Sequence, residues 1–291
     1  MTSQLKTILL LGLLSAVIIG MGGLVGGRTG LVIACGLALV MNIGSYWFSD
    51  SIVLRMYGAR ELSRSEAPWL HQIVESLAQR AGIPKPRICS IPEEAPNAFA
   101  TGRNPEHGVI AVTDGIMRIL SPEELRGVIA HEMAHIANRD ILIQTIAGVM
   151  GSVIVMLANM MQFTAFFGGS RGNDNEGGGT SPLAAIFMAI LAPIAASLIQ
   201  MAISRSREYL ADETGASLCG QPLALAGALH KLSGAAGALP LHSGNACTEQ
   251  MFIVKPVFGF GGSMNNLFST HPPIEERIQR LVDMSRTGQY R

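Results

Sequence analysis

Charged residues are scarce in this chain. Only 14% of its 291 residues are Asp, Glu, Lys or Arg, against about 25% in ordinary soluble proteins. The 21 basic and 21 acidic residues cancel, so no basic excess is present to bind nucleic acid, and we expect no nucleic-acid partner. The mean hydropathy is +0.35. A sparsely charged, apolar chain of this kind favours a membrane protein.

The chain also lacks paired cysteines. Its four cysteines are Cys35, Cys89, Cys219 and Cys247, and no two of them are spaced as a C-x-x-C site. This spacing argues against a disulfide framework. We interpret the cysteines as reduced thiols that face the cytoplasm or the lipid.

Charge is absent altogether from two early runs, residues 7–27 and 30–49. Each run matches the roughly 20 residues that cross a bilayer as a helix. A cleaved signal peptide is the alternative for the first run, but the run is long and a second one follows after a short link at Arg28. We therefore expect an N-terminal transmembrane hairpin over residues 1–50.

Two later runs are also apolar, residues 141–165 and 183–203. The Gly-rich segment 168–180 between them lacks the G-K-[ST] ending of a phosphate-binding loop and is interpreted as an exposed turn. Both runs are long enough to span a membrane, although buried or membrane-lying helices are the alternative. We expect a second transmembrane hairpin over residues 141–203.

The remaining segments, residues 51–140 and 204–291, are soluble in character. An amphipathic pattern predicts a helix over residues 70–81, and two short apolar runs predict strands over 87–91 and 109–113. The expected fold is mainly α with a small β-sheet (α+β). In this fold four transmembrane helices carry one soluble domain that is built from the two segments.

The basic residues near the ends of the predicted spans give an orientation. Most of them lie on one side of the membrane: Lys6, Arg55, Arg60, Arg64, Arg139, Arg205 and Arg207. Only Arg28 and Arg171 lie on the other side. Cytoplasmic loops carry the excess of Lys and Arg, so we expect both soluble segments to face the cytoplasm.

The sequence HEMAH, from His131 to His135, matches the H-E-x-x-H pattern of zinc peptidases. Residues i and i+4 share one face of an α-helix, so two imidazoles can bind one metal ion. Glu132 is then placed to accept a proton from a water molecule. Ser121 and Glu124 predict a capping box at the start of this helix. Two hydrogen-bonded core histidines are the alternative, but a capped helix with this Glu favours a metal site.

A catalytic zinc usually takes three protein ligands. The metzincin extension would need Gly at 138 and His at 141, and the residues present are Asn138 and Ile141. A Glu from a second helix is the other common arrangement, and Glu208 in an E-x-x-x-D pattern is the best candidate. Asp212, one turn later, can hold the outer N–H of a ligand His. Ordinary surface charge is the alternative for both acidic residues.

Four segments together resemble those of the HtpX family of membrane-bound heat-shock proteases: NAFATG (97–102), HEMAH (131–135), SRSREYLADE (204–213) and HPPIEERI (271–278). More distantly they resemble the CAAX prenyl proteases, which are gluzincins. The four apolar runs occur in the same order. The resemblance implies a gluzincin-like endopeptidase domain that faces the cytoplasm from a multi-pass inner-membrane protein and degrades misfolded or damaged membrane proteins.

The resemblance also implies roles for individual residues. His131, His135 and Glu208 are similar to the ligands of one zinc ion (Zn2+) per chain, and Glu132 is similar to the general base. Asp212 is similar to the carboxylate that supports a ligand His. The segment from 234 to 262 matches no motif.

Two further parts of the site are expected. From its spacing, His271 before two prolines would be a helix-entry residue, but the resemblance implies that it faces the oxyanion. An extended edge segment is predicted to bind peptide substrate by strand addition, which gives affinity with little sequence selectivity. Its residues are Asn97, Ala98, Phe99, Ala100 and Thr101.

Two other functions fit the same motif. An intramembrane metalloprotease would bury H-E-x-x-H in lipid, but Glu123, Glu124 and Arg126 lie beside it, and charges are costly there. A non-catalytic membrane zinc-binding protein would have no need of Glu132. The expected partners are therefore protein or peptide substrates and the lipid bilayer. Metals other than zinc remain an alternative.

Overall fold

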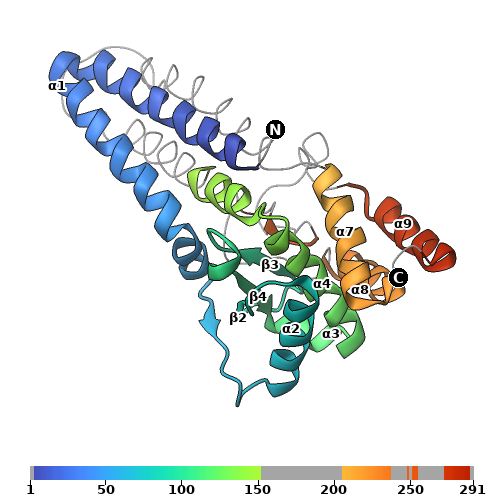
Figure 1. Ribbon diagram of the computed structural model, residues 1–291. Helices are drawn as coiled ribbons and strands as arrows, with labels where there is room; N and C mark the ends of the chain where they lie inside the picture. The colour runs from blue at the N-terminus through green and yellow to red at the C-terminus, as the bar shows by residue number, and fades with distance from the viewer. Residues whose placement is uncertain (1–2, 152–204, 237–247, 249–250, 255–271, 289–291) are drawn as a thin grey trace, which may run out of the picture.

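The computed structural model describes residues 3–151, 205–236, 248, 251–254 and 272–288 (Figure 1). Several predictions lie outside these residues. They are the role of His271, the loop at 168–180, most of the third predicted span and all of the fourth.

The N-terminal helix α1 (Ser3–Met56) is bent into two arms at Gly27, whose φ of 56° is left-handed. The arms lie side by side and project from the rest of the molecule (Figure 1). Asn42 Nδ2 on one arm donates a hydrogen bond to Ser15 Oγ on the other, at 2.7 Å. Glycine suits this bend because a left-handed φ carries no steric penalty without a Cβ atom.

Within the described part of the chain, one helix is long and apolar enough to cross a membrane, Gly27–Met56. A shorter apolar helix, Ile141–Gly151, begins the third predicted run. The structure therefore supports a mainly helical protein with a small sheet, and among the described residues it offers one candidate span, which covers the second predicted run.

The sheet has four strands, β1 (Arg60–Glu61), β2 (Arg87–Ile91), β3 (Ala98–Thr101) and β4 (Val109–Thr113). Their order is β1-β2-β4-β3, with β2 and β4 parallel and the other two pairs antiparallel. The predicted strands 87–91 and 109–113 are confirmed. Strand β3 lies at one edge, so its outer backbone groups are available to other segments.

Both faces of the sheet are covered, because alternate side chains of β4 lie in two different apolar clusters. Ile110 and Val112 point into one apolar cluster, and Val109 and Ala111 point into another. The first cluster is formed with helices α2 (Pro68–Ala81), α4 (Pro122–Ala137), α7 (Arg205–Cys219), α8 (Pro222–Ala236) and α9 (Ile274–Thr287). The second is formed with the end of α1, the helix Ile141–Gly151 and Met251–Phe252. A short helix, α3 (Asp114–Ile119), and a 3-10 turn, η1 (Pro105–His107), complete the described elements.

Helix α4 lies at the centre of this arrangement. Its predicted capping box is confirmed: Ser121 Oγ accepts from the backbone N–H of Glu124 at 3.2 Å, and Glu124 Oε2 accepts from that of Ser121 at 2.8 Å. Helix α7 packs against α4 through Gly215, where a Cβ atom would lie only 2.8 Å from the backbone nitrogen of His131. The two helices thus approach closely at the turn that carries the first histidine.

Candidate metal centre

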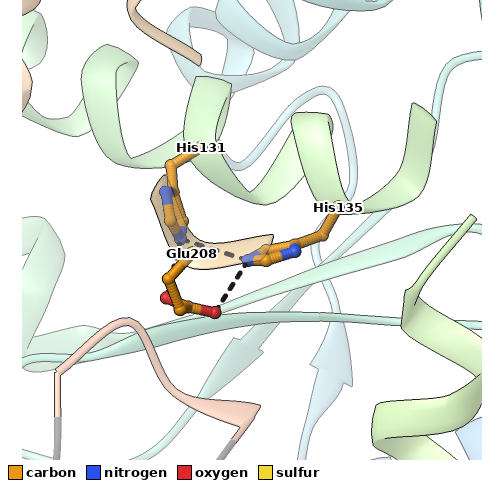
Figure 2. Close-up of side chains that lie close together, drawn as sticks. All are labelled: His131, His135 and Glu208. Carbon is orange, nitrogen blue, oxygen red and sulfur yellow. Dashed lines mark hydrogen bonds and ion pairs between the residues drawn. The ribbon is translucent and has the colours of Figure 1, made fainter. Parts of the chain in front are cut away.

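The two histidines of HEMAH point from α4 toward α7 (Figure 2). Their Nε2 atoms lie 3.2 Å apart, and both side chains are buried. The helical spacing predicts this geometry, because four residues advance the helix by about one turn.

Glu208 reaches the same point from the first turn of α7 (Figure 2). Its Oε1 lies 3.5 Å from His135 Nε2, and its Oε2 lies 3.7 Å from His131 Nε2. One ligand atom from each of the three residues lies within 4.8 Å of the others. Two imidazole nitrogens and one carboxylate oxygen are a donor set that suits zinc, so the residues fit a metal ion.

Each histidine contacts a carboxylate through Nδ1, the ring nitrogen that does not face the other ligands. Asp212 Oδ1 lies 2.9 Å from His131 Nδ1. Asp140 Oδ1 lies 3.1 Å from His135 Nδ1, and this contact was not predicted. A carboxylate at Nδ1 holds the proton there and leaves the lone pair of Nε2 for a metal. The sequence feature that could have indicated Asp140 is its position just beyond the end of α4.

Glu132 lies between α4 and the edge of the sheet and is buried. Its carboxylate accepts a hydrogen bond from the backbone N–H of Ala100 on β3. Burial raises the pKa of this carboxyl to about 8, against the opposing attraction of His135. Burial therefore makes this carboxylate a stronger proton acceptor than that of an ordinary Glu.

The predicted substrate edge is partly covered. The backbone N–H of Ile253 donates to the carbonyl of Ala98 at 3.1 Å, and Asn97 Nδ2 donates to the carbonyl of Val254 at 2.7 Å. Phe99 packs against Tyr57 and Phe252 in the second core cluster.

The last two residues of this edge differ in what they contact. Thr101 Oγ1 contacts Thr145 Oγ1 at 3.0 Å and faces the core. Ala100 is the residue of the predicted set whose backbone reaches Glu132.

Arg277 on α9 is a further site residue that the sequence did not reveal. Its guanidinium is fully buried and forms two hydrogen bonds of 2.7 Å to the two carboxylate oxygens of Asp212. It also donates to the carbonyl of Ile253 at 3.0 Å and lies 3.7 Å from Glu208 Oε2. Burial works to lower the pKa of Arg277, but Asp212, Glu208 and Glu132 outweigh it, so its pKa stays above the usual value. The one sequence feature that could have indicated Arg277 is its place within the segment HPPIEERI (271–278).

The described fold and this cluster define a membrane-associated metallopeptidase. The model of peptidase family M48 matches residues 64–285, and the chain belongs to this family. A protease HtpX homolog of Syntrophobacter fumaroxidans is 56% identical over 98% of this chain and 100% of the relative. Others are the protease HtpX homologs of Pyrococcus furiosus, 56% identical over 95% of this chain and 94% of the relative, and of Ralstonia pickettii, 52% identical over 100% and 99%.

A solved structure shares the fold. The crystal structure of S. mikatae Ste24p matches with a TM-score of 0.50 and 20% identity. The match covers 93% of this chain and 62% of that one. The family match and the curated relatives confirm the resemblance to the HtpX family, and as a protease the chain acts on protein or peptide substrates.

Proposed function

We propose that this protein is a zinc endopeptidase that cleaves misfolded or damaged membrane proteins at the cytoplasmic face of the bacterial inner membrane. The observation that carries the proposal is the convergence of His131, His135 and Glu208 next to Glu132. A metal site without catalysis has no need of a buried carboxylate at that position.

In this proposal His131, His135 and Glu208 hold the zinc, and Asp212 supports His131. Zinc, when bound, supplies a Lewis acid that makes a water molecule more acidic and polarises a carbonyl group. The residues of the chain do the rest.

Glu132 takes the proton of the attacking water and passes it to the leaving amine. The Ala100 N–H group orients its carboxylate, and the buried setting keeps bulk water away from the transferred proton.

The proposed substrate is an extended peptide that lies along β3. The edge at Asn97 and Ala98 contacts residues 253–254, so the peptide would pair from the carbonyl group of Ala100 onward, beside Glu132. Backbone pairing of this kind tolerates many side chains and suits an enzyme that removes damaged proteins of varied sequence. His271 is proposed to donate a hydrogen bond to the oxyanion.

The proposed membrane arrangement keeps residues 1–50 and 141–203 as two transmembrane hairpins. The protease domain is formed by residues 51–140 and 204–291. The apolar helix Gly27–Met56 supports the first hairpin. The second is supported by the helix Ile141–Gly151, which packs against α1 with Met150 Sδ 3.9 Å from Ser45 Oγ.

A direct test uses the full-length protein in detergent with zinc and an unfolded polypeptide as substrate. The wild-type protein should release fragments, and the Glu132→Gln variant should not, because an amide cannot accept the proton. Fragments released at the same rate by both proteins would contradict the proposed base.

A further inference from the structure

Arg277 joins three parts of the site that are far apart in the sequence. Its Nε and Nη2 atoms bind Asp212 on α7, and its Nη1 atom binds the carbonyl of Ile253. Ile253 in turn donates to Ala98 on β3. One side chain therefore links α9 and α7 to the segment that covers part of the sheet edge.

The guanidinium holds Asp212 in one orientation. Two parallel hydrogen bonds fix the plane of the carboxylate, which a single point charge cannot do. In that orientation Oδ1 lies 2.9 Å from His131 Nδ1. Without Arg277 the carboxylate would be free to rotate, and His131 would lose the contact that sets its tautomer and direction.

Charge gives a second reason for a cation here. Asp212 and Glu208 are both buried, and each lies near Arg277 as a negative charge, Asp212 at 2.7 Å and Glu208 at 3.7 Å. A buried carboxylate needs a partner because burial without one is costly. Arg277, with Nη1 3.7 Å from Glu208 Oε2, supplies positive charge on the side of Glu208 away from His135.

We propose that Arg277 is a positioning residue of the metal centre, which acts through Asp212 to aim His131 at the point where Glu208 and His135 converge. The same side chain holds Ile253 against the edge of β3. This inference rests on the proposed function, in which His131, His135 and Glu208 hold zinc.

The test compares zinc affinities of full-length protein in detergent, measured by competition with a chelator. Arg277→Met removes the guanidinium but keeps much of the stem, and Arg277→Lys keeps the charge without the fork. Arg286→Met is the matched control, because Arg286 lies on the same helix and its side chain is 72% exposed.

Arg277→Met should weaken zinc binding by about 10–100-fold, the usual effect of losing such an outer partner. Arg277→Lys should bind zinc about tenfold more weakly than the wild type, and Arg286→Met should have the zinc affinity of the wild type. In an Asp212→Asn background, adding Arg277→Met should weaken zinc binding by less than about tenfold, because the path through Asp212 is already broken and only the Arg277 charge near Glu208 is lost.

The outcomes separate the two proposals. A folded wild-type protein that binds no zinc would overturn the proposed function. A wild-type protein that binds zinc, with folded Arg277→Met of equal affinity, would overturn the role of Arg277 alone. A purely structural Arg277 would lower the melting temperature of the zinc-free protein and leave the affinity of the folded protein unchanged.

If Arg277→Met does not fold, Arg277→Lys decides the question, and wild-type zinc affinity in Arg277→Lys would overturn the inference. If Arg277→Met folds, a further loss of about 10–100-fold on adding it to Asp212→Asn would also overturn the inference.

Discussion

Replacing Gly215 by Ala should loosen the metal centre without touching a ligand. The added Cβ would lie 2.8 Å from His131 N, 2.9 Å from its Cα and 3.0 Å from the carbonyl carbon of Ala130. Ordinary contacts begin near 3.4 Å, so α7 must move away from α4 by about 0.6 Å. All three obstructing atoms are backbone, and therefore no side-chain rotation can relieve the clash.

This shift reaches the ligands because Glu208 lies seven residues earlier on α7, about two turns away on the same face. Metal–ligand distances tolerate only about 0.2 Å. The zinc-free protein relieves the overpacking strain of about 1–3 kcal/mol by this shift. Zinc binding must draw Glu208 back and restore the strain, and each 1.4 kcal/mol of it costs about tenfold in affinity. We expect zinc to bind about 10–100-fold more weakly to Gly215→Ala.

Stability should change much less than zinc affinity. Alanine favours a helix over glycine by about 1 kcal/mol, which offsets part of the strain. Chelator competition measures the affinity, and thermal unfolding with excess chelator measures the zinc-free fold. Gly234→Ala on α8 is the control, since nothing lies within 4 Å of its added Cβ. Wild-type zinc affinity in Gly215→Ala would refute the claim that this helix contact sets the position of Glu208.

Three other predictions concern Asp140, His271 and the loop 168–180. Asp140→Asn should weaken zinc binding by about 10–100-fold, because His135 loses its carboxylate partner at Nδ1; chelator competition measures this. His271→Ala should retain zinc while kcat falls by about 10²–10³-fold, as for a lost oxyanion donor, in kinetics at saturating substrate. A reporter fused within residues 168–180 should indicate the periplasm, as the positive-inside rule requires.

Each of these has a result that would count against it. Asp140→Asn with unchanged zinc affinity would show that His135 needs no outer partner. A near wild-type kcat in His271→Ala would make that residue a helix-entry His. A cytoplasmic reporter signal within 168–180 would mean that the third and fourth apolar runs do not cross the membrane.

The sequence predicted those parts of the site that depend on local spacing. The pair His131 and His135, with Glu132 between them, follows from the helical repeat, and Ser121 with Glu124 marks where that helix begins. The strands β2 and β4 also follow from short apolar runs bounded by polar residues. Glu208 lies in another helix, and its prediction needed the E-x-x-x-D pattern that it forms with Asp212.

The parts of the site that the sequence did not predict depend on tertiary contacts. Arg277 lies in an amphipathic helix that has arginines on its exposed face as well, so its burial could not be seen from spacing. Gly215 is an ordinary helical glycine until its distance to His131 is known. The segment around Ile253 has no periodicity, and its contact with Ala98 arises between residues more than 150 positions apart.

The central claim is that His131, His135 and Glu208 hold one zinc ion per chain that Glu132 uses in catalysis. The most direct measurement is the zinc content of purified full-length protein, with peptide cleavage measured on the same samples. The wild type should contain about one zinc per chain and cleave, Glu132→Gln should contain as much zinc and not cleave, and Glu208→Ala should contain little zinc and not cleave. Full zinc content and full activity in Glu208→Ala would contradict the account.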